Sequence, residues 1–186
     1  QRCKKQFESV YGGTKATGKL LSCVVQGANY PDLRKRCAEE LSDIGFDGYN
    51  FGGFVVNDKG DLVLDEMAAV IENTPSDKFK YAMGVGKPED IRRASKIGYK
   101  VFDTVLVTRN ARHGTLYSSD IEEEVLRIGK AEYAEDLKPI DSRCDCYTCQ
   151  THSRSYVHQM LKVGEATGMT LATIHNLRYY QNLVQG

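Results

Sequence analysis

The stretch from Phe79 to Leu106, FKYAMGVGKPEDIRRASKIGYKVFDTVL, carries the pattern that decides the fold. Residues Phe79 to Met83 predict a short strand, and Tyr99 to Leu106 predict a second one. Between them a glycine-rich turn leads to Pro88, a residue that favours the first turn of a helix, and Ile97–Gly98 end that helix. A strand, a helix and a second strand in this order are typical of a parallel βαβ unit.

The same alternation occurs earlier in the chain. Leu20 to Val25 is a continuous apolar run, typical of a strand buried on both faces, and GFDGYNFGG at residues 45–53 contains another short strand. Helical spacing predicts a helix after each of them, over Pro31 to Asp43 and around Leu64 to Ile71. Four strand-to-helix units predict a parallel sheet that forms half of a (β/α)8 barrel, because a whole barrel takes roughly 250 residues.

The pattern changes after Gly114. A β-like, charged segment at residues 115–133 leads to a cluster of cysteines, and two helices follow. The first helix is expected over Ser153 to Thr167 and the second from about Leu171, with Gly168 as the terminator between them. We therefore expect two domains, a half barrel at residues 1–114 and a metal-binding subdomain with closing helices at residues 115–186.

Composition limits the class of protein. Of the 186 residues 41% are hydrophobic, which allows a real core. The 25 basic residues balance 25 acidic ones, so a broadly basic nucleic-acid binder is excluded and any RNA contact must rest on a few placed cations. No run is long and apolar enough to span a bilayer, and we expect a soluble protein with no membrane partner. The first residue is Gln1 and not Met, which predicts a fragment of a longer protein.

Three cysteines and one histidine have the spacing of a metal site. They are Cys144, Cys146, Cys149 and His175. Three thiolates and one imidazole make a closed tetrahedral site of the structural zinc type, which leaves no open position for water. We therefore expect Zn²⁺ to hold the C-terminal helices and not to catalyse. Two alternatives stay open at this point: a disulfide with a spare thiol, and His152 or His158 as the fourth ligand, over which spacing favours His175 only slightly.

Asp103 lies in the apolar segment VFDTVLV at residues 101–107, where an acid is costly unless it is paired or takes part in chemistry. A carboxylate there can attack the anomeric carbon of a sugar and form a covalent glycosyl intermediate. Taken alone, Asp103 is more simply interpreted as a local cap or one half of an ion pair.

Two segments could contact phosphate groups. GVGKPED at residues 84–90 follows a strand and leads into a helix N-terminus, although an ordinary barrel loop is an equal alternative. Arg109 and Arg112, in TRNARHG at residues 108–114, form a compact basic pair suited to phosphate or guanine edges. A solvated loop is the alternative interpretation of that pair.

Six segments, taken together, resemble one known family over nearly the whole chain. In chain order they are VVQGANYPDLR (24–34), IGFDGYNFGG (44–53), YAMGVGKPEDI (81–91), VFDTVLVTRNARHG (101–114), DLKPIDSRCDCYTC (136–149) and TIHNLRYYQNL (173–183). The family is that of the tRNA-guanine transglycosylases, also called queuine tRNA-ribosyltransferases. Six segments in the family's order make the resemblance specific.

The resemblance implies a fold and a reaction. The fold is a (β/α)8 TIM barrel with a zinc-binding insertion, of which this chain would be the C-terminal half. Asp103 would be the nucleophile that attacks ribose C1′ of the wobble guanosine, after which guanine leaves and a 7-deazaguanine enters. The family's second acid or base belongs to the N-terminal half of the barrel, so the chain alone is not expected to be a competent enzyme.

The resemblance also implies site residues. The base would be held by Gln26, Gly53 and Met83. The RNA would be held by Gly84, Val85, Gly86, Lys87, Pro88, Glu89 and Asp90, and its anticodon by Thr108, Arg109, Asn110, Ala111 and Arg112. The zinc ligands would be Cys144, Cys146, Cys149 and His175, which selects His175 among the histidines.

The implied partners are a tRNA with a GUN anticodon and a base, either 7-aminomethyl-7-deazaguanine or queuine. A homodimer or heterodimer in the cytoplasm is expected by the same resemblance. The alternative is a non-catalytic accessory subunit, or a zinc-organised module for tRNA binding and dimerisation. Accessory relatives lack the nucleophile, so the presence of Asp103 favours the enzyme. A DNA-binding zinc protein is disfavoured by the neutral charge and by the ligand spacing.

Overall fold

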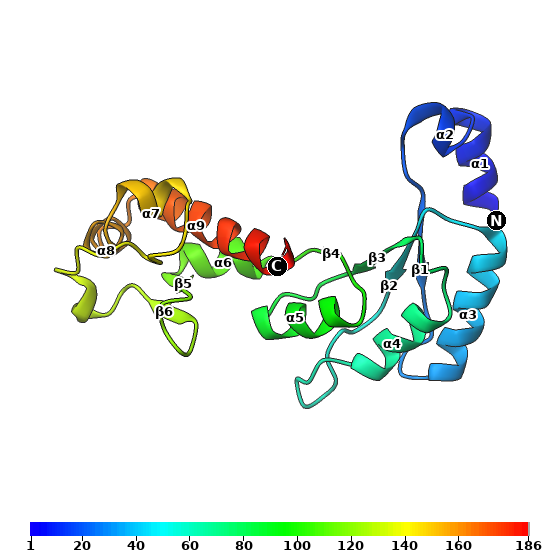
Figure 1. Cartoon of the computed structure of the whole chain (residues 1–186), viewed down its shortest axis with the longest axis horizontal. Coiled ribbons are helices and arrows are strands. Elements are labelled where there is room, and N and C mark those ends of the chain that lie inside the picture. Colours follow the sequence, from blue (N-terminus) through cyan, green and yellow to red (C-terminus); the bar gives the residue numbers. More distant parts are fainter. Residues whose placement is uncertain (186) are drawn as a thin grey trace. The chain divides into compact units, whose positions relative to one another are not determined.

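The computed structural model describes residues 1–185 (Figure 1), and these residues separate into two compact units. The first unit is Gln1–Val85 with Glu89–Asp103, and the second is Gly86–Pro88 with the chain from Thr104 onward. The division into domains at Gly114 stays a prediction. No helix among residues 1–185 is both long and apolar enough to cross a membrane.

The first unit is built on a parallel sheet. Its strands stand in chain order: β1 (Ser22–Val25), β2 (Gly48–Phe51), β3 (Phe79–Ala82) and β4 (Val101–Phe102). Helix α3 (Pro31–Ile44) follows β1, α4 (Leu64–Glu72) follows β2, and α5 (Pro88–Lys96) follows β3. The parallel α/β sheet predicted from the alternating pattern is therefore confirmed. Two short helices, α1 (Arg2–Tyr11) and α2 (Thr14–Thr17), precede the sheet.

The core of the first unit lies between the sheet and its helices. Val25 and Phe51 contribute from the sheet and Met67 and Ile91 from the helices, and each is almost completely buried. Burial alternates along β1, where Cys23 and Val25 are buried and Val24 is 38% exposed, so the prediction that this strand is buried on both faces was wrong. The packed core holds in place the ends of the strands, where the candidate site residues lie.

The fourth strand is shorter than expected. The sequence predicted a strand from Tyr99 to Leu106, but only Val101–Phe102 pair with β3, and Leu106–Arg112 form helix α6. Thr104 explains the change of structure, because its hydroxyl accepts a hydrogen bond from the Leu106 amide at 3.1 Å and so satisfies a donor at the start of the helix. Asp103 consequently lies just after the strand, exposed to solvent.

The second unit joins a small antiparallel hairpin to a group of helices. The hairpin consists of β5 (Thr115–Tyr117) and β6 (Val125–Arg127), which confirms the β-like segment, and a 3-10 turn η1 (Ala131–Tyr133) follows. The helices are α6, α7 (Tyr147–Thr151), α8 (Arg154–Lys162) and α9 (Ala166–Gln185). One buried cluster contains Leu116, Leu126, Ile140, Val157 and the three neighbouring cysteines.

Gly168 does not terminate a helix. Helix α8 ends at Lys162, Gly164 takes the left-handed turn with φ +77°, and α9 already includes Gly168. A Cβ on Gly168 would lie 2.7 Å from the Cβ of Met160. The glycine is therefore needed because α8 and α9 approach each other closely at this point, and the predicted break was wrong.

Candidate functional site

The four parallel strands end in one row. Val25, Phe51, Ala82 and Phe102 are register partners along the sheet, so the next residue of each strand emerges at the same edge. These next residues are Gln26, Gly52, Met83 and Asp103. The carboxyl edge of a parallel sheet is where ligand sites form in α/β proteins. We call this row, with Gly53 and Gly84, the rim.

Asp103 uses only one of its carboxylate oxygens for internal contacts. Oδ1 accepts hydrogen bonds from the Tyr81 hydroxyl at 2.7 Å and from the Gly84 amide at 2.9 Å. Within residues 1–185 no donor reaches Oδ2, and no cation pairs with the carboxylate. The residue does cap a backbone amide, as the simpler interpretation expected, but it also presents a free, oriented oxygen to solvent.

Tyr81 remains a hydrogen-bond donor at neutral pH. The pKa of its phenol is raised, first because the proton is bonded to Asp103 and second because of burial. Tyr81 lies in β3, two residues before Met83, and the sequence did not single it out.

Gln26 lies against Gly52 at the rim, and Gly53 follows Gly52 in the chain. A Cβ on Gly52 would lie 2.7 Å from Nε2 of Gln26, so the amide side chain of Gln26 lies against a surface that only glycine leaves open. Gly53 is exposed and has φ +110°, a conformation that a side chain would strain. Met83 is 39% exposed on the same edge, where a flexible apolar side chain can contact a planar ligand.

The loop GVGKPED has both buried and exposed parts. Val85, Gly86 and Asp90 are buried. Lys87 and Glu89 are exposed, and Pro88 is half-buried at the first position of α5. The buried residues of the loop therefore fix its position, and the exposed ammonium group of Lys87 can contact an anion.

The basic pair lies on a helix and not on a loop. Arg109 and Arg112 are both exposed in α6, one helical turn apart, so their guanidinium groups share a face. Thr108 is half-buried, Ala111 is fully buried, and the amide of Asn110 donates to the Tyr117 hydroxyl at 2.7 Å. Helix α6 thus presents the two arginines and packs its other side into the unit.

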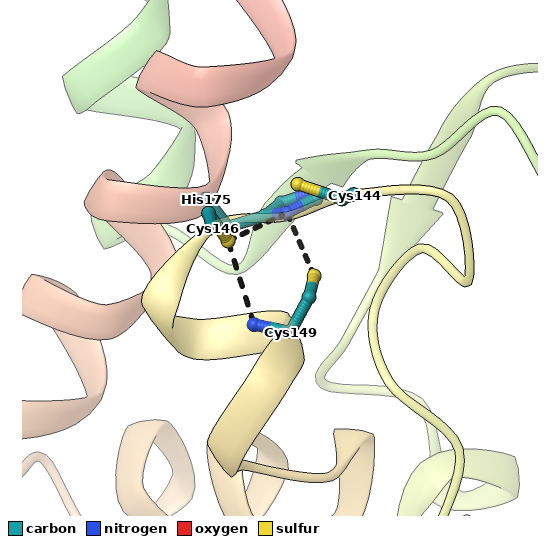
Figure 2. A group of neighbouring side chains, drawn as sticks. All are labelled: Cys144, Cys146, Cys149 and His175. Atoms are coloured by element: carbon teal, nitrogen blue, oxygen red, sulfur yellow. Dashed lines mark hydrogen bonds between the residues drawn. The ribbon is translucent and has the colours of Figure 1, made fainter.

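The predicted metal ligands form one compact cluster (Figure 2). Cys144, Cys146, Cys149 and His175 offer ligand atoms that all lie within 4.8 Å of one another, and all four side chains are buried. His175 comes from α9, and the cysteines come from the turn into α7 and from α7 itself. All six cysteines are free thiols, so the disulfide alternative is not supported.

The distances fit zinc. Nδ1 of His175 lies 3.2 Å from Sγ of Cys149 and 3.8 Å from Sγ of Cys146. Tetrahedral zinc has bonds of roughly 2.3 Å to sulfur and 2.0 Å to nitrogen, which places these ligands about 3.5 Å apart. Nε2 of His175 donates to the Tyr117 carbonyl at 2.6 Å, and this contact turns Nδ1 to the sulfurs, where it could bind a metal ion once it has lost its proton.

The pKa values of the clustered cysteines and of His175 also favour the binding of a cation. The hydrogen bond from Cys149 lowers the pKa of the Cys146 thiol to about 3 against the opposing effect of burial. The pKa of Cys149 is raised, because its proton is held between the two sulfurs and because it is buried. For His175, burial lowers the pKa, but hydrogen bonds with Cys144 and Cys146 outweigh it and raise the pKa to about 9. A divalent cation would take the place of these shared protons.

The other two candidate histidines, His152 and His158, have different partners. Nδ1 of His158 lies 2.7 Å from the Ile128 carbonyl, and His152 packs between the rings of Tyr147 and Tyr156. The cluster therefore selects His175, as the resemblance implied.

Comparison with known proteins agrees with this geometry. The family model described as queuine tRNA-ribosyltransferase matches residues 1–186. The chain belongs to this family. Similar proteins with that name occur in Psychrobacter sp. (44% identity) and Psychrobacter cryohalolentis (44% identity); each match covers 100% of this chain and 48% of the relative. A third, in Mannheimia succiniciproducens, is 46% identical over 87% of this chain and 42% of its own length. The chain spans about half the length of the curated relatives it matches.

Two further residues support the candidate sites, and no motif in the sequence indicates either of them. Arg34 is 1% exposed in α3 beside the rim, and Asn176 is fully buried in α9 beside His175. Arginine and asparagine are usually exposed, and no local pattern distinguishes these two from the other polar residues of their helices. Only their burial identifies them.

Proposed function

We propose that this chain is the C-terminal half of a tRNA-guanine transglycosylase, which exchanges the wobble guanine of a tRNA for a 7-deazaguanine. The observation that carries the proposal is the position of Asp103. Its carboxylate lies at the carboxyl edge of the sheet, with Oδ1 held by two donors and Oδ2 free. The proposal is also supported by the family that the chain matches, because the relatives in that family are named for this activity.

The reaction follows from two displacements at one carbon. Oδ2 of Asp103 attacks ribose C1′, and the bond from C1′ to the guanine nitrogen breaks with its electron pair on the base. The product is an aspartyl-ribose ester. The nitrogen of the incoming base then attacks C1′, the ester bond breaks, and the carboxylate is regenerated with overall retention. The acid or base that handles protons on the two bases belongs to the rest of the full-length protein.

The rim supplies the base pocket in this proposal. Gln26 and the backbone of Gly53 hydrogen-bond the base, and Met83 forms a wall of the pocket. The loop Gly84–Asp90 and the segment Thr108–Arg112 bind the tRNA, whose anticodon is GUN. Their exposed cations, Lys87, Arg109 and Arg112, are suited to its phosphates and guanine edges.

Zinc has a structural role in this proposal. Four protein ligands close its coordination shell, so Zn²⁺ bound there supplies cohesion between α7 and α9 and no reactive water.

The sheet order favours half of a (β/α)8 barrel. β1 and β4 are the outer strands of the parallel sheet, and strands from the rest of a full-length protein would pair with them. We further propose that residues 1–114 serve this barrel and residues 115–186 the zinc-binding subdomain. The complete protein would act in the cytoplasm as a homodimer or heterodimer.

The test is incorporation of radiolabelled guanine into a tRNA with guanine at the wobble position. It uses the chain extended to the length of its relatives, with Asp103→Asn and the exposed control Asp77→Asn. We expect Asp103→Asn to lower exchange by about a thousandfold or more, because the nucleophile is lost, while the control exchanges normally. Wild-type protein should also form an adduct with tRNA that survives denaturation.

An extended wild-type protein that binds tRNA but neither exchanges guanine nor forms the adduct would overturn the proposal. The alternative, a zinc-organised module for tRNA binding and dimerisation, would then be the better interpretation.

A further inference from the structure

Arg34 is a buried cation of helix α3. Its side chain is 1% exposed, and no carboxylate within residues 1–185 forms an ion pair with it. The guanidinium carbon lies 4.1 Å from the centre of the Phe51 ring. A buried charge without an ion pair is costly unless hydrogen bonds satisfy its polar groups.

Three backbone carbonyls satisfy the guanidinium. Nε donates to Ala28 at 2.8 Å, Nη1 to Val25 at 3.2 Å and Nη2 to Gly52 at 3.0 Å. Val25 and Ala28 flank Gln26, and Gly52 precedes Gly53. One side chain therefore ties together the two loops that carry the proposed base-binding residues.

The backbone around Arg34 is adapted to it. Ala28 has φ +48°, a left-handed conformation that is unfavourable for a residue with a side chain. Its carbonyl is held by Nε of Arg34. A Cβ on Gly27, which has φ +154°, would lie 2.5 Å from Cγ of Arg34. The loop after β1 thus takes its shape against this arginine.

The Gly52–Gly53 peptide is oriented by the same contact. The carbonyl of Gly52 and the amide of Gly53 belong to one trans peptide and point in opposite directions. Because the carbonyl faces the buried guanidinium, the Gly53 N–H faces away from it, and within residues 1–185 it has no hydrogen-bond partner. A cation bonded to the carbonyl polarises the peptide and makes its N–H a stronger donor.

We propose that Arg34 is a positioning residue that aims and polarises the Gly53 N–H for the carbonyl oxygen of the guanine ring. This inference rests on the proposed function. Guanine offers O6 and N7 as acceptors on that edge, and a 7-deazaguanine lacks N7. O6 is therefore the acceptor that the leaving and the entering base share.

The same contact would stabilise the transition state. When the bond between C1′ and guanine breaks, its electron pair stays on the base, and part of the negative charge reaches O6 through the ring. The departing base later takes up a proton from an acid or from water. A donor aimed in advance at the oxygen on which charge develops is worth more in the transition state than in the ground state.

The experiment compares two bases on the extended protein. Guanine carries the carbonyl, and 2-aminopurine lacks that oxygen; the dissociation constant of each is measured by competition against radiolabelled guanine. The variants are Arg34→Met, Arg34→Lys and the control Arg36→Met, which removes an exposed arginine from the same helix. Thermal unfolding of each variant is recorded alongside.

We expect Arg34→Met to weaken the binding of guanine by about tenfold and the binding of 2-aminopurine by less than about twofold, because only guanine accepts a hydrogen bond from the polarised donor. Arg34→Lys, which keeps a charge, should fall between Arg34→Met and wild type, and Arg36→Met should match wild type. Equal weakening of both bases would show a merely structural role and overturn the inference. Absence of any guanine binding to wild type would instead count against the proposed function.

A second measurement applies if the variants do not fold. The amide proton of Gly53 is followed by NMR in wild-type protein. Binding of guanine should move the Gly53 amide resonance downfield, as a new hydrogen bond does. Binding of 2-aminopurine should leave that chemical shift nearly unchanged. An unchanged Gly53 resonance with guanine bound would overturn the inference.

Discussion

At the scale of single residues, the two oxygens of Asp103 have different environments. Oδ1 accepts hydrogen bonds from Tyr81 and Gly84, whereas no group among residues 1–185 donates a hydrogen bond to Oδ2. In an ester formed through Oδ2, Oδ1 becomes the carbonyl oxygen. The same two donors would then stabilise the negative charge that returns to the carboxylate when the ester bond breaks.

Changing Tyr81→Phe should therefore slow the second displacement more than the first. Losing one donor leaves the negative charge that develops on Asp103 less stabilised and makes the carboxylate a poorer leaving group, at a cost of about 1.5–3 kcal/mol for a hydrogen bond to a charged group. We expect the denaturation-resistant adduct with tRNA to accumulate while turnover falls about tenfold or more. The measurement is the fraction of protein in the adduct at steady state.

Tyr99→Phe is the matched control, because its hydroxyl donates to the Met67 carbonyl at 3.0 Å inside the core. It should lower stability without raising the adduct fraction. An adduct fraction in Tyr81→Phe equal to that of wild type would contradict this role for Tyr81.

At the scale of elements, α9 holds several segments of the second unit through one stretch of side chains. His175 reaches the Tyr117 carbonyl, and the hydroxyl of Tyr180 donates to the Gly86 carbonyl at 2.7 Å. Asn176 donates to the carbonyls of Val107 and Thr115 and accepts from the Tyr117 amide. The helix that carries the candidate metal ligand His175 therefore also positions the basic helix α6 and part of the loop proposed to bind RNA.

Asn176→Asp should strongly destabilise the second unit. The new carboxylate would face two carbonyl oxygens in a fully buried position, and we expect a loss of about 3 kcal/mol in the free energy of unfolding. Urea denaturation measures this loss. The same change at the exposed Asn182 of α9 should cost less than about 0.5 kcal/mol. Equal effects at the two positions would show that the contacts of Asn176 do not stabilise the fold.

At the scale of the whole molecule, the two units differ in what stabilises them. The sheet and helices of the first unit enclose an apolar core. In the second unit the three cysteines of the metal cluster are part of the buried core itself. Bound metal should therefore contribute to the stability of the second unit alone.

Removing metal with a strong chelator should loosen the second unit selectively. We expect amide hydrogen exchange to rise in α7, β5 and the part of α9 near His175, and to stay unchanged in β1 to β3. Mass spectrometry of the exchanged peptides measures this, and re-addition of Zn²⁺ should restore protection. A uniform rise over both units, or none at all, would contradict a structural metal confined to the second unit.

Local patterns predicted much of the fold. The apolar runs, the glycines at strand ends and the early Pro88 indicated the parallel sheet and its helices, because they reflect interactions within a few residues. Asp103 was placed within a strand because its neighbours are apolar, whereas strand pairing ends at Phe102 for lack of further partners on β3. Gly168 resembles a helix end in the sequence because glycine often ends helices, whereas its actual role is to allow the close approach of α8 to α9.

The amino-acid sequence alone indicated which residues have suitable chemistry: the closely spaced cysteines, the carboxylate in the apolar segment at residues 101–107 and the glycines at the strand ends. Only the tertiary structure decided how they are used. It selected His175 over two nearer histidines, left Oδ2 of Asp103 free and buried Arg34 against three carbonyls. The reason is that ligand geometry and the burial of polar groups arise from contacts between residues far apart in the chain, which no local periodicity records.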